Sequence, residues 1–173
     1  TFVYSFDQTR DLLRLYAEHR DSLPREANIE PQWVIGESGQ PVALLEVTYA
    51  GDAVAGEQAL AAFLSYGKRL AGEYGPVSYA ALQTAYDGLT AHGQLNYMKS
   101  GFLGELNETI IDEMVGNYEG ENLPYVWFQH LGGAISDRES TDTAFAHRGA
   151  SYNFGVSDTW QDESVSDPKI ASI

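Results

Sequence analysis

The sequence feature that most constrains the fold is a pair of β-rich runs joined by a short turn that contains glycine. The runs at 33–35 and 41–49 flank Gly36-Glu37-Ser38-Gly39, a pattern typical of a β-hairpin. Strands joined by such a turn are antiparallel. Further strands are expected at 1–4, 95–103, 125–131 and 151–160, with helices at 7–20, 53–71, 78–88 and 107–116. Hairpins alternating with helices predict an α+β domain, with a single antiparallel sheet and helices packed on one face.

The expected helices rest on capping residues and apolar spacing. Asp7 is placed as the N-cap of the first helix, and Ser78 and Asn107 as the N-caps of two later ones. The helix at 53–71 is expected to bury Leu60, Phe63, Leu64 and Leu70. The segment at 161–173 is acidic and weakly patterned.

The composition indicates one globular domain and excludes thiol chemistry. The chain has 173 residues, of which 43% are apolar, so residues 1–173 can form one domain with a real core. It has no cysteine, which excludes disulfides, thiolate zinc sites, iron–sulfur clusters and a cysteine nucleophile. Because the first residue is Thr1 rather than Met, we expect a piece of a longer protein.

The charge argues against two classes of partner. Ten basic and 25 acidic residues give a formal net charge of −15, whereas nucleic-acid binding needs clustered Lys and Arg. The same imbalance disfavours an anionic membrane surface, and no apolar run approaches the length of about 20 residues that spans a bilayer. No signal peptide opens the sequence, which is compatible with the cytoplasm, although a longer protein would carry any such signal upstream.

Motifs for the common nucleotide and metal chemistries are absent from the sequence. It contains no G-x-G-x-x-G that opens a helix, no P-loop, no G-x-S-x-G and no H-E-x-x-H. Its four histidines show no metal-ligand spacing, so no metal is expected.

The most informative segment begins with the strand predicted at 125–131. Alternate residues of a strand share a face, so Trp127 and Gln129 point the same way, opposite to Phe128 and His130. An aromatic–amide face suits the wall of an organic ligand site. From spacing alone, however, packing of either face on helices is the favoured interpretation.

Two motifs carry a family resemblance. Gln129-His-Leu-Gly-Gly-Ala, followed by Thr143-Ala-Phe-Ala-His-Arg-Gly-Ala-Ser-Tyr-Asn, resembles the substrate-binding domain of FAD-linked oxidases of the berberine bridge enzyme-like group. Segments that begin at Leu44, Tyr74 and Tyr97 agree with it in order and spacing. Ala146 stands where that group usually has Pro.

The resemblance implies an antiparallel sheet that covers the flavin of a separate FAD-binding domain, which is absent from this chain. It places Trp127, Gln129, Tyr152 and Asn153 at the substrate, although Tyr152 and Asn153 have opposite parity and only one can face the flavin. Gln129 stands where some members have a carboxylate base; an amide orients a hydroxyl but takes no proton. No catalytic residue is assigned. Structural roles near the site are expected for Gly132, Gly133, His147 and Arg148.

Two functions of different class follow. The first is the substrate-binding domain of an FAD-dependent oxidoreductase that oxidises a small organic substrate by hydride transfer to flavin, with O2 as acceptor; the isolated chain is then inactive. The alternative is a stand-alone, non-catalytic module that binds a ligand or another protein. A face uncovered by the loss of the FAD-binding domain would also favour a homodimer of the fragment.

Overall fold

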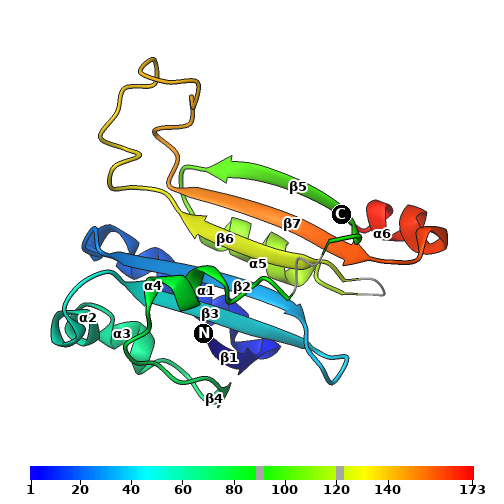
Figure 1. Cartoon of the computed structure of the whole chain (residues 1–173), viewed down its shortest axis with the longest axis horizontal. Coiled ribbons are helices and arrows are strands. Elements are labelled where there is room, and N and C mark those ends of the chain that lie inside the picture. Colours follow the sequence, from blue (N-terminus) through cyan, green and yellow to red (C-terminus); the bar gives the residue numbers. More distant parts are fainter. Residues whose placement is uncertain (89–91, 120–122) are drawn as a thin grey trace.

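A computed structural model describes residues 1–88, 92–119 and 123–173, and these form a seven-stranded antiparallel sheet ordered β4-β1-β3-β2-β6-β7-β5 (Figure 1). The strands are β1 (Phe2–Ser5), β2 (Ala27–Ile35), β3 (Pro41–Tyr49), β4 (Arg69–Ala71), β5 (Leu95–Leu103), β6 (Tyr125–His130) and β7 (Tyr152–Trp160). The α-helices are α1 (Thr9–His19), α2 (Ala53–Ala59), α3 (Ala61–Leu64), α4 (Tyr79–Gln83), α5 (Glu108–Gly116) and α6 (Ser166–Ala171). Single 3-10 turns occupy Phe6–Gln8, Arg20–Ser22 and Glu163–Val165. The predicted α+β class is confirmed.

The two faces of the sheet differ in what covers them. Helices α1 and α5 lie behind the sheet in the view of Figure 1, and this covered face carries the core. Residues of one parity on β2 and β6 supply it: Trp33 and Phe128 are fully buried, and Val126 is 5% exposed. Residues of the other parity, including Gln32 and Trp127, point to the opposite face, which we call the open face. A ligand site on the open face is therefore lined by residues of this second parity.

The predicted hairpin is the centre of the sheet. β2 and β3 pair from Ala27↔Tyr49 to Ile35↔Pro41, so β2 begins well before the predicted residue 33. The Gly36 N–H donates to the Gln40 carbonyl at 2.9 Å, and Gly39 turns the chain with a φ of 77°. A positive φ of this kind favours glycine.

The helix predicted at 53–71 is wrong in its second half. The helical stretch made of α2 and α3 ends at Leu64, the last residue of α3. The predicted end of the helix is instead strand β4, which pairs with β1. Gly67 has a φ of 58°, and the Gln8 side-chain oxygen accepts from the Lys68 N–H at 2.9 Å. These two features turn the chain out of the helix into the edge strand, where Leu70 is 60% exposed rather than buried.

The predicted caps have mixed outcomes. The Ser78 hydroxyl accepts from the Ala81 N–H at 3.2 Å, and the Asn107 side chain accepts from the Ile110 N–H at 3.1 Å, which confirms both caps. Asp7 is not a cap: it lies within a 3-10 turn, and α1 begins only at Thr9. Among the described residues, no helix is long and apolar enough to cross a membrane.

Candidate functional site

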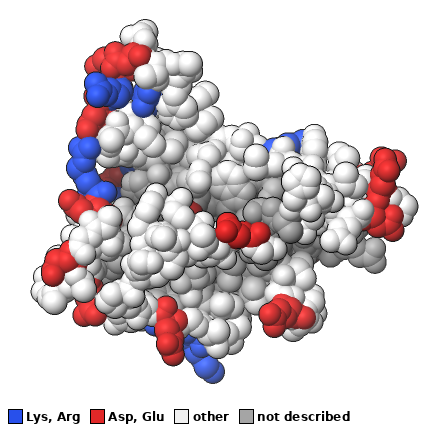
Figure 2. All heavy atoms as spheres, viewed as in Figure 1, with Lys and Arg blue, Asp and Glu red and all other residues white. Residues whose placement is uncertain are grey.

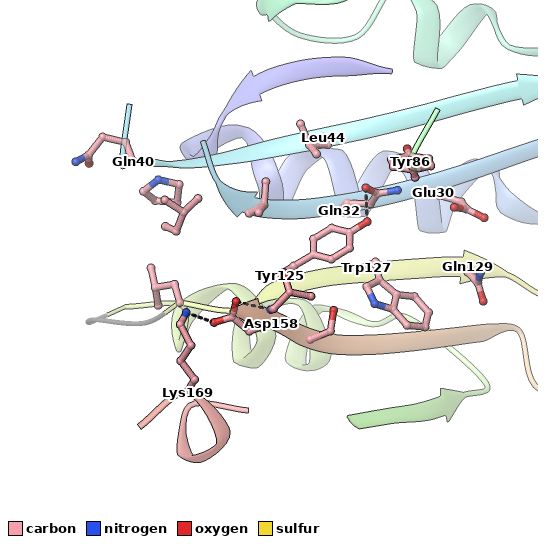
Figure 3. Close-up of a pocket in the computed structure, with 17 residues that line it drawn as sticks. Glu30, Gln32, Gln40, Leu44, Tyr86, Tyr125, Trp127, Gln129, Asp158 and Lys169 are labelled. Carbon is pink, nitrogen blue, oxygen red and sulfur yellow. Dashed lines mark hydrogen bonds and ion pairs between the residues drawn. The ribbon is translucent and has the colours of Figure 1, made fainter. Parts of the chain in front are cut away.

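The open face holds a pocket of about 1060 Å³ between the β2–β3 hairpin and β6–β7 (Figure 3). This volume slightly exceeds the range usual for organic ligands, about 300–1000 Å³. The lining residues come from both halves of the sheet, from α6 and from connecting segments: Glu30, Gln32, Val34, Ile35, Gly39, Gln40, Pro41, Leu44, Tyr86, Leu123, Tyr125, Trp127, Gln129, Ser157, Asp158, Thr159 and Lys169.

Trp127 lies flat across the neighbouring strand. It pairs with Gly155 of β7, and a Cβ atom added at residue 155 would come within 2.1 Å of the Trp127 Cζ2 atom. Only glycine therefore lets the indole occupy this place, where it forms a wall of the pocket. Gly155 was not identified from the sequence, although a glycine inside a strand often marks the close approach of another group.

Gln129 and Asn153 meet as a cross-strand pair on the open face. The Asn153 Nδ2 group donates to Gln129 Oε1 at 3.0 Å, in the register Gln129↔Asn153. The Asn153 Oδ1 atom is buried and has no hydrogen-bond partner among the described residues. The two N–H donors of Gln129 can meet a ligand, and its carbonyl oxygen, which accepts one bond from Asn153, keeps a second lone pair.

Tyr152 lies on the covered face, away from the pocket. It is 3% exposed, packs edge-on against Tyr16 with ring centroids 5.5 Å apart, and has the Arg20 guanidinium 5.2 Å from its ring centroid. The structure therefore removes Tyr152 from the pocket residues expected from the sequence. Of the two neighbours with opposite parity, Asn153 is the one that shares a face with Gln129.

The four residues expected to have structural roles belong to the long connection between β6 and β7, which projects beyond the sheet (Figure 1). His147 stacks on Phe102 with ring centroids 4.0 Å apart, and Arg148 donates to the Ile135 carbonyl at 3.1 Å. Gly133 has a φ of 53°, and Gly132 packs close to His130. None of these four lines the pocket.

The acidic part of that connection is held by Arg25, in the turn before β2, which binds Asp137 at 2.8 Å. Arg148 binds the Thr143 hydroxyl and lies over the Phe145 ring.

The sequence analysis missed a set of polar side chains at one end of the pocket, namely Glu30, Gln32, Tyr86 and Tyr125. Gln32 is 3% exposed, and its Oε1 atom accepts from the Tyr125 hydroxyl at 2.6 Å. Burial raises the pKa of Tyr125. Burial also raises the pKa of Glu30, against the opposing effect of its hydrogen bond from Asn28. These side chains occupy the open-face positions of β2 and β6, so a longer predicted β2 would have placed Glu30 and Gln32 beside the pocket.

Tyr86 joins these polar side chains from the segment after α4, which crosses the open face in Figure 1. Its hydroxyl donates to Glu46 of β3. Burial, together with this bond, raises the pKa of Tyr86 to about 12. At the other end of the pocket, Lys169 of α6 forms an ion pair with Asp158 of β7.

Charge on the open face lies mainly at its periphery, while much of its middle is uncharged (Figure 2). The described residues contain no group of three or more His, Asp or Glu side chains that could hold a metal ion. The pocket thus combines aromatic and aliphatic walls with a few polar groups, which is the composition of an organic ligand site.

Comparison with known proteins finds similarity through structure. No family model matches the sequence, and no curated protein gives a significant sequence match. Berberine bridge enzyme-like 1 from Physcomitrella patens superposes with a TM-score of 0.78 at 15% identity, covering 99% of this chain and 40% of that one. Berberine bridge enzyme-like 28 from Arabidopsis thaliana gives 0.76 at 16% identity, covering 99% and 40%. GilR, an oxidoreductase that catalyses the terminal step of gilvocarcin biosynthesis, gives 0.71 at 18% identity, covering 98% and 39%.

These matches confirm the resemblance predicted from the sequence at the level of fold. The chain has the fold of one part of berberine bridge enzyme-like proteins and spans about 40% of the length of those it matches.

Proposed function

We propose that this chain is the substrate-binding part of an FAD-dependent oxidoreductase, in which the open-face pocket holds a small organic substrate. The observation that carries the proposal is the pocket itself, with Trp127, Gln129 and Asn153 gathered on the uncovered face of a berberine bridge enzyme-like fold. The flavin, with O2 as the final electron acceptor, would supply the redox chemistry.

The residues of this chain suit a substrate better than they suit FAD itself. A dinucleotide needs donors or cations for its diphosphate, but Lys169, the cation that lines the pocket, is already paired with Asp158. The carboxylate of Glu30 also lines the pocket and would repel phosphate. We therefore assign FAD to a domain outside this chain, and the pocket to the substrate.

The roles of the pocket residues follow from their chemistry. Trp127 offers a flat apolar surface to a ring or hydrocarbon portion of the substrate. Gln129, held by Asn153 at 3.0 Å, directs its N–H donors toward a substrate oxygen and so orients it. Because an amide accepts no proton near neutral pH, neither Gln129 nor Asn153 acts as a base.

The partner in this proposal is the FAD-binding domain of the same parent protein. The segment from β4 to α4 exposes large apolar side chains that a partner would cover: Leu70 is 60% exposed, Tyr74 53%, Val77 62% and Tyr79 74%. Apolar groups exposed in this way mark interaction surfaces. Without that domain, we expect the same surface to favour a homodimer, which light scattering over a range of concentrations would detect.

The test compares this chain with a longer gene product that contains it. The longer protein should purify with a flavin absorption spectrum, and Gln129→Ala should raise KM or lower kcat about tenfold, the size of one lost hydrogen bond to a charged or developing-charge group. The thermal transition of that variant should stay unchanged, because Gln129 is exposed.

The isolated chain should neither retain added FAD after gel filtration nor oxidise substrates. Tight flavin binding by the isolated chain, or a longer protein with no flavin, would contradict the proposal. The second of these results would favour a stand-alone binding module.

A further inference from the structure

We infer that the polar end of the pocket recognises a hydrogen-bond donor on the substrate, and that Gln32 is the positioning residue that sets this preference. The inference rests on the proposed function in one respect, namely that the pocket binds a substrate. It concerns which chemical group of that substrate lies beside Tyr125 and Glu30.

The first step is the direction of the hydrogen bonds. Tyr125 donates its only hydroxyl hydrogen to Gln32 Oε1 at 2.6 Å (Figure 3). The Tyr86 phenol, which lines the same pocket, donates its own hydroxyl hydrogen to Glu46. Both phenols in this part of the pocket therefore use their hydrogens on protein acceptors.

The second step is what these bonds leave for a ligand. A phenol has one hydrogen and can accept through its oxygen lone pairs. Because the hydrogen of Tyr125 is used by Gln32, its oxygen can only accept from a ligand in the pocket. The neighbouring Glu30 carboxylate is an acceptor as well. A substrate hydroxyl or amine N–H is therefore favoured at the Tyr125 oxygen, whereas an ether oxygen or a carboxylate finds no donor in that phenol.

The third step is that water does not readily compete for this bond. Gln32 is 3% exposed, so its Oε1 atom stays paired with the Tyr125 hydroxyl. Gln129 lies farther along β6, on the same side of the pocket as Glu30 in Figure 3, and carries N–H donors. The preference for a substrate donor therefore belongs to the position beside the Tyr125 oxygen and not to the pocket as a whole.

The test measures binding of three probes to the isolated chain by NMR, following the Trp127 indole N–H. The probes are 2-naphthylmethanol, its methyl ether and 2-naphthoate, which share one aromatic body. We expect the alcohol to bind about tenfold more tightly than the ether, the ratio set by roughly one hydrogen bond. The naphthoate should be the weakest.

Two variants should abolish this ratio by opposite routes. In Gln32→Leu the Tyr125 hydrogen is released and can point at the ligand, so the ether should gain affinity. In Tyr125→Phe the acceptor is lost, so the alcohol should lose affinity while the ether stays unchanged. Leu44→Ala, in the apolar lining, is the matched control: it should weaken both probes and preserve the ratio.

Equal affinities of alcohol and ether for the unaltered chain, or no binding of either, would overturn the inference. So would a Gln32→Leu variant that folds and keeps the ratio; if that variant does not fold, Tyr125→Phe decides alone. These measurements need no flavin. A correct ratio in a protein whose parent lacks FAD would refute only the proposed function, and a flavoprotein parent without the ratio would refute only this inference.

Discussion

Replacing Gly155 by alanine tests whether the Trp127 wall depends on the missing side chain. The added Cβ would stand 2.1 Å from Trp127 Cζ2 and 2.4 Å from Cε2, far inside van der Waals contact, so the indole must leave its place. Overpacking of this kind costs about 1–3 kcal/mol. Alanine also lowers the conformational entropy of the unfolded chain, which stabilises the folded state by about 0.4–1 kcal/mol. We expect a net destabilisation of about 1–2 kcal/mol by the difference of these two effects.

For a domain of this size, such a change lowers Tm by roughly 2–8 °C, which differential scanning calorimetry can resolve. Gly104→Ala is the matched control, because a Cβ there has no heavy atom within 4 Å. A double-mutant cycle isolates the contact. In a Trp127→Ala background, Gly155→Ala should be neutral or slightly stabilising, since the clash is gone. An equal cost of Gly155→Ala in both backgrounds would refute the reasoning.

Three further predictions concern the frame that holds the pocket. Burial and the Arg20 charge hold the pKa of His130 below its usual range. The unfolded chain therefore binds a proton first as pH falls below about 6.5, and stability should fall with it. His130→Gln should flatten that slope in urea titrations between about pH 7 and 5. Asp52→Ala removes the N-cap of α2, whose side chain accepts from two backbone N–H groups at 3.0 Å, and should cost about 1 kcal/mol by chemical denaturation. Phe128→Ala, at a fully buried ring, should cost about 3–5 kcal/mol, and a smaller loss would contradict its place in the core.

The parts of the fold that the sequence predicted are those set by local pattern. The hairpin at Gly36–Gly39 and the alternation through Val126, Trp127 and Phe128 depend only on neighbours in the chain, and both are confirmed. The prediction of a helix over 53–71 is wrong in its second half because a residue distant in the sequence determines where the helix ends. The side chain of Gln8, in the turn before α1, accepts a hydrogen bond from the Lys68 N–H, and residues 69–71 pair with β1.

The same limit applies to the candidate site. Parity alone showed that Tyr152 and Asn153 face opposite ways, but choosing between them required the register of β6 against β7. In that register Asn153 lies opposite Gln129, and Tyr152 falls beneath α1 beside Tyr16. Family resemblance supported both residues equally, and only the packing of a distant helix separates them.

Gln32 shows why the polarity of a pocket is harder to predict than its walls. In the sequence, Glu30 and Gln32 alternate with apolar residues of β2, and such a pattern usually indicates a solvated face. Gln32 is nevertheless 3% exposed, and Tyr125, 93 residues away in the sequence, donates to its Oε1 atom. Because that bond uses the Tyr125 hydrogen, the phenol oxygen presents an acceptor to the pocket. The wall needs only an aromatic residue at position 127 and a glycine at 155, whereas the preference for a donor depends on a bond between two side chains that lie far apart in the sequence.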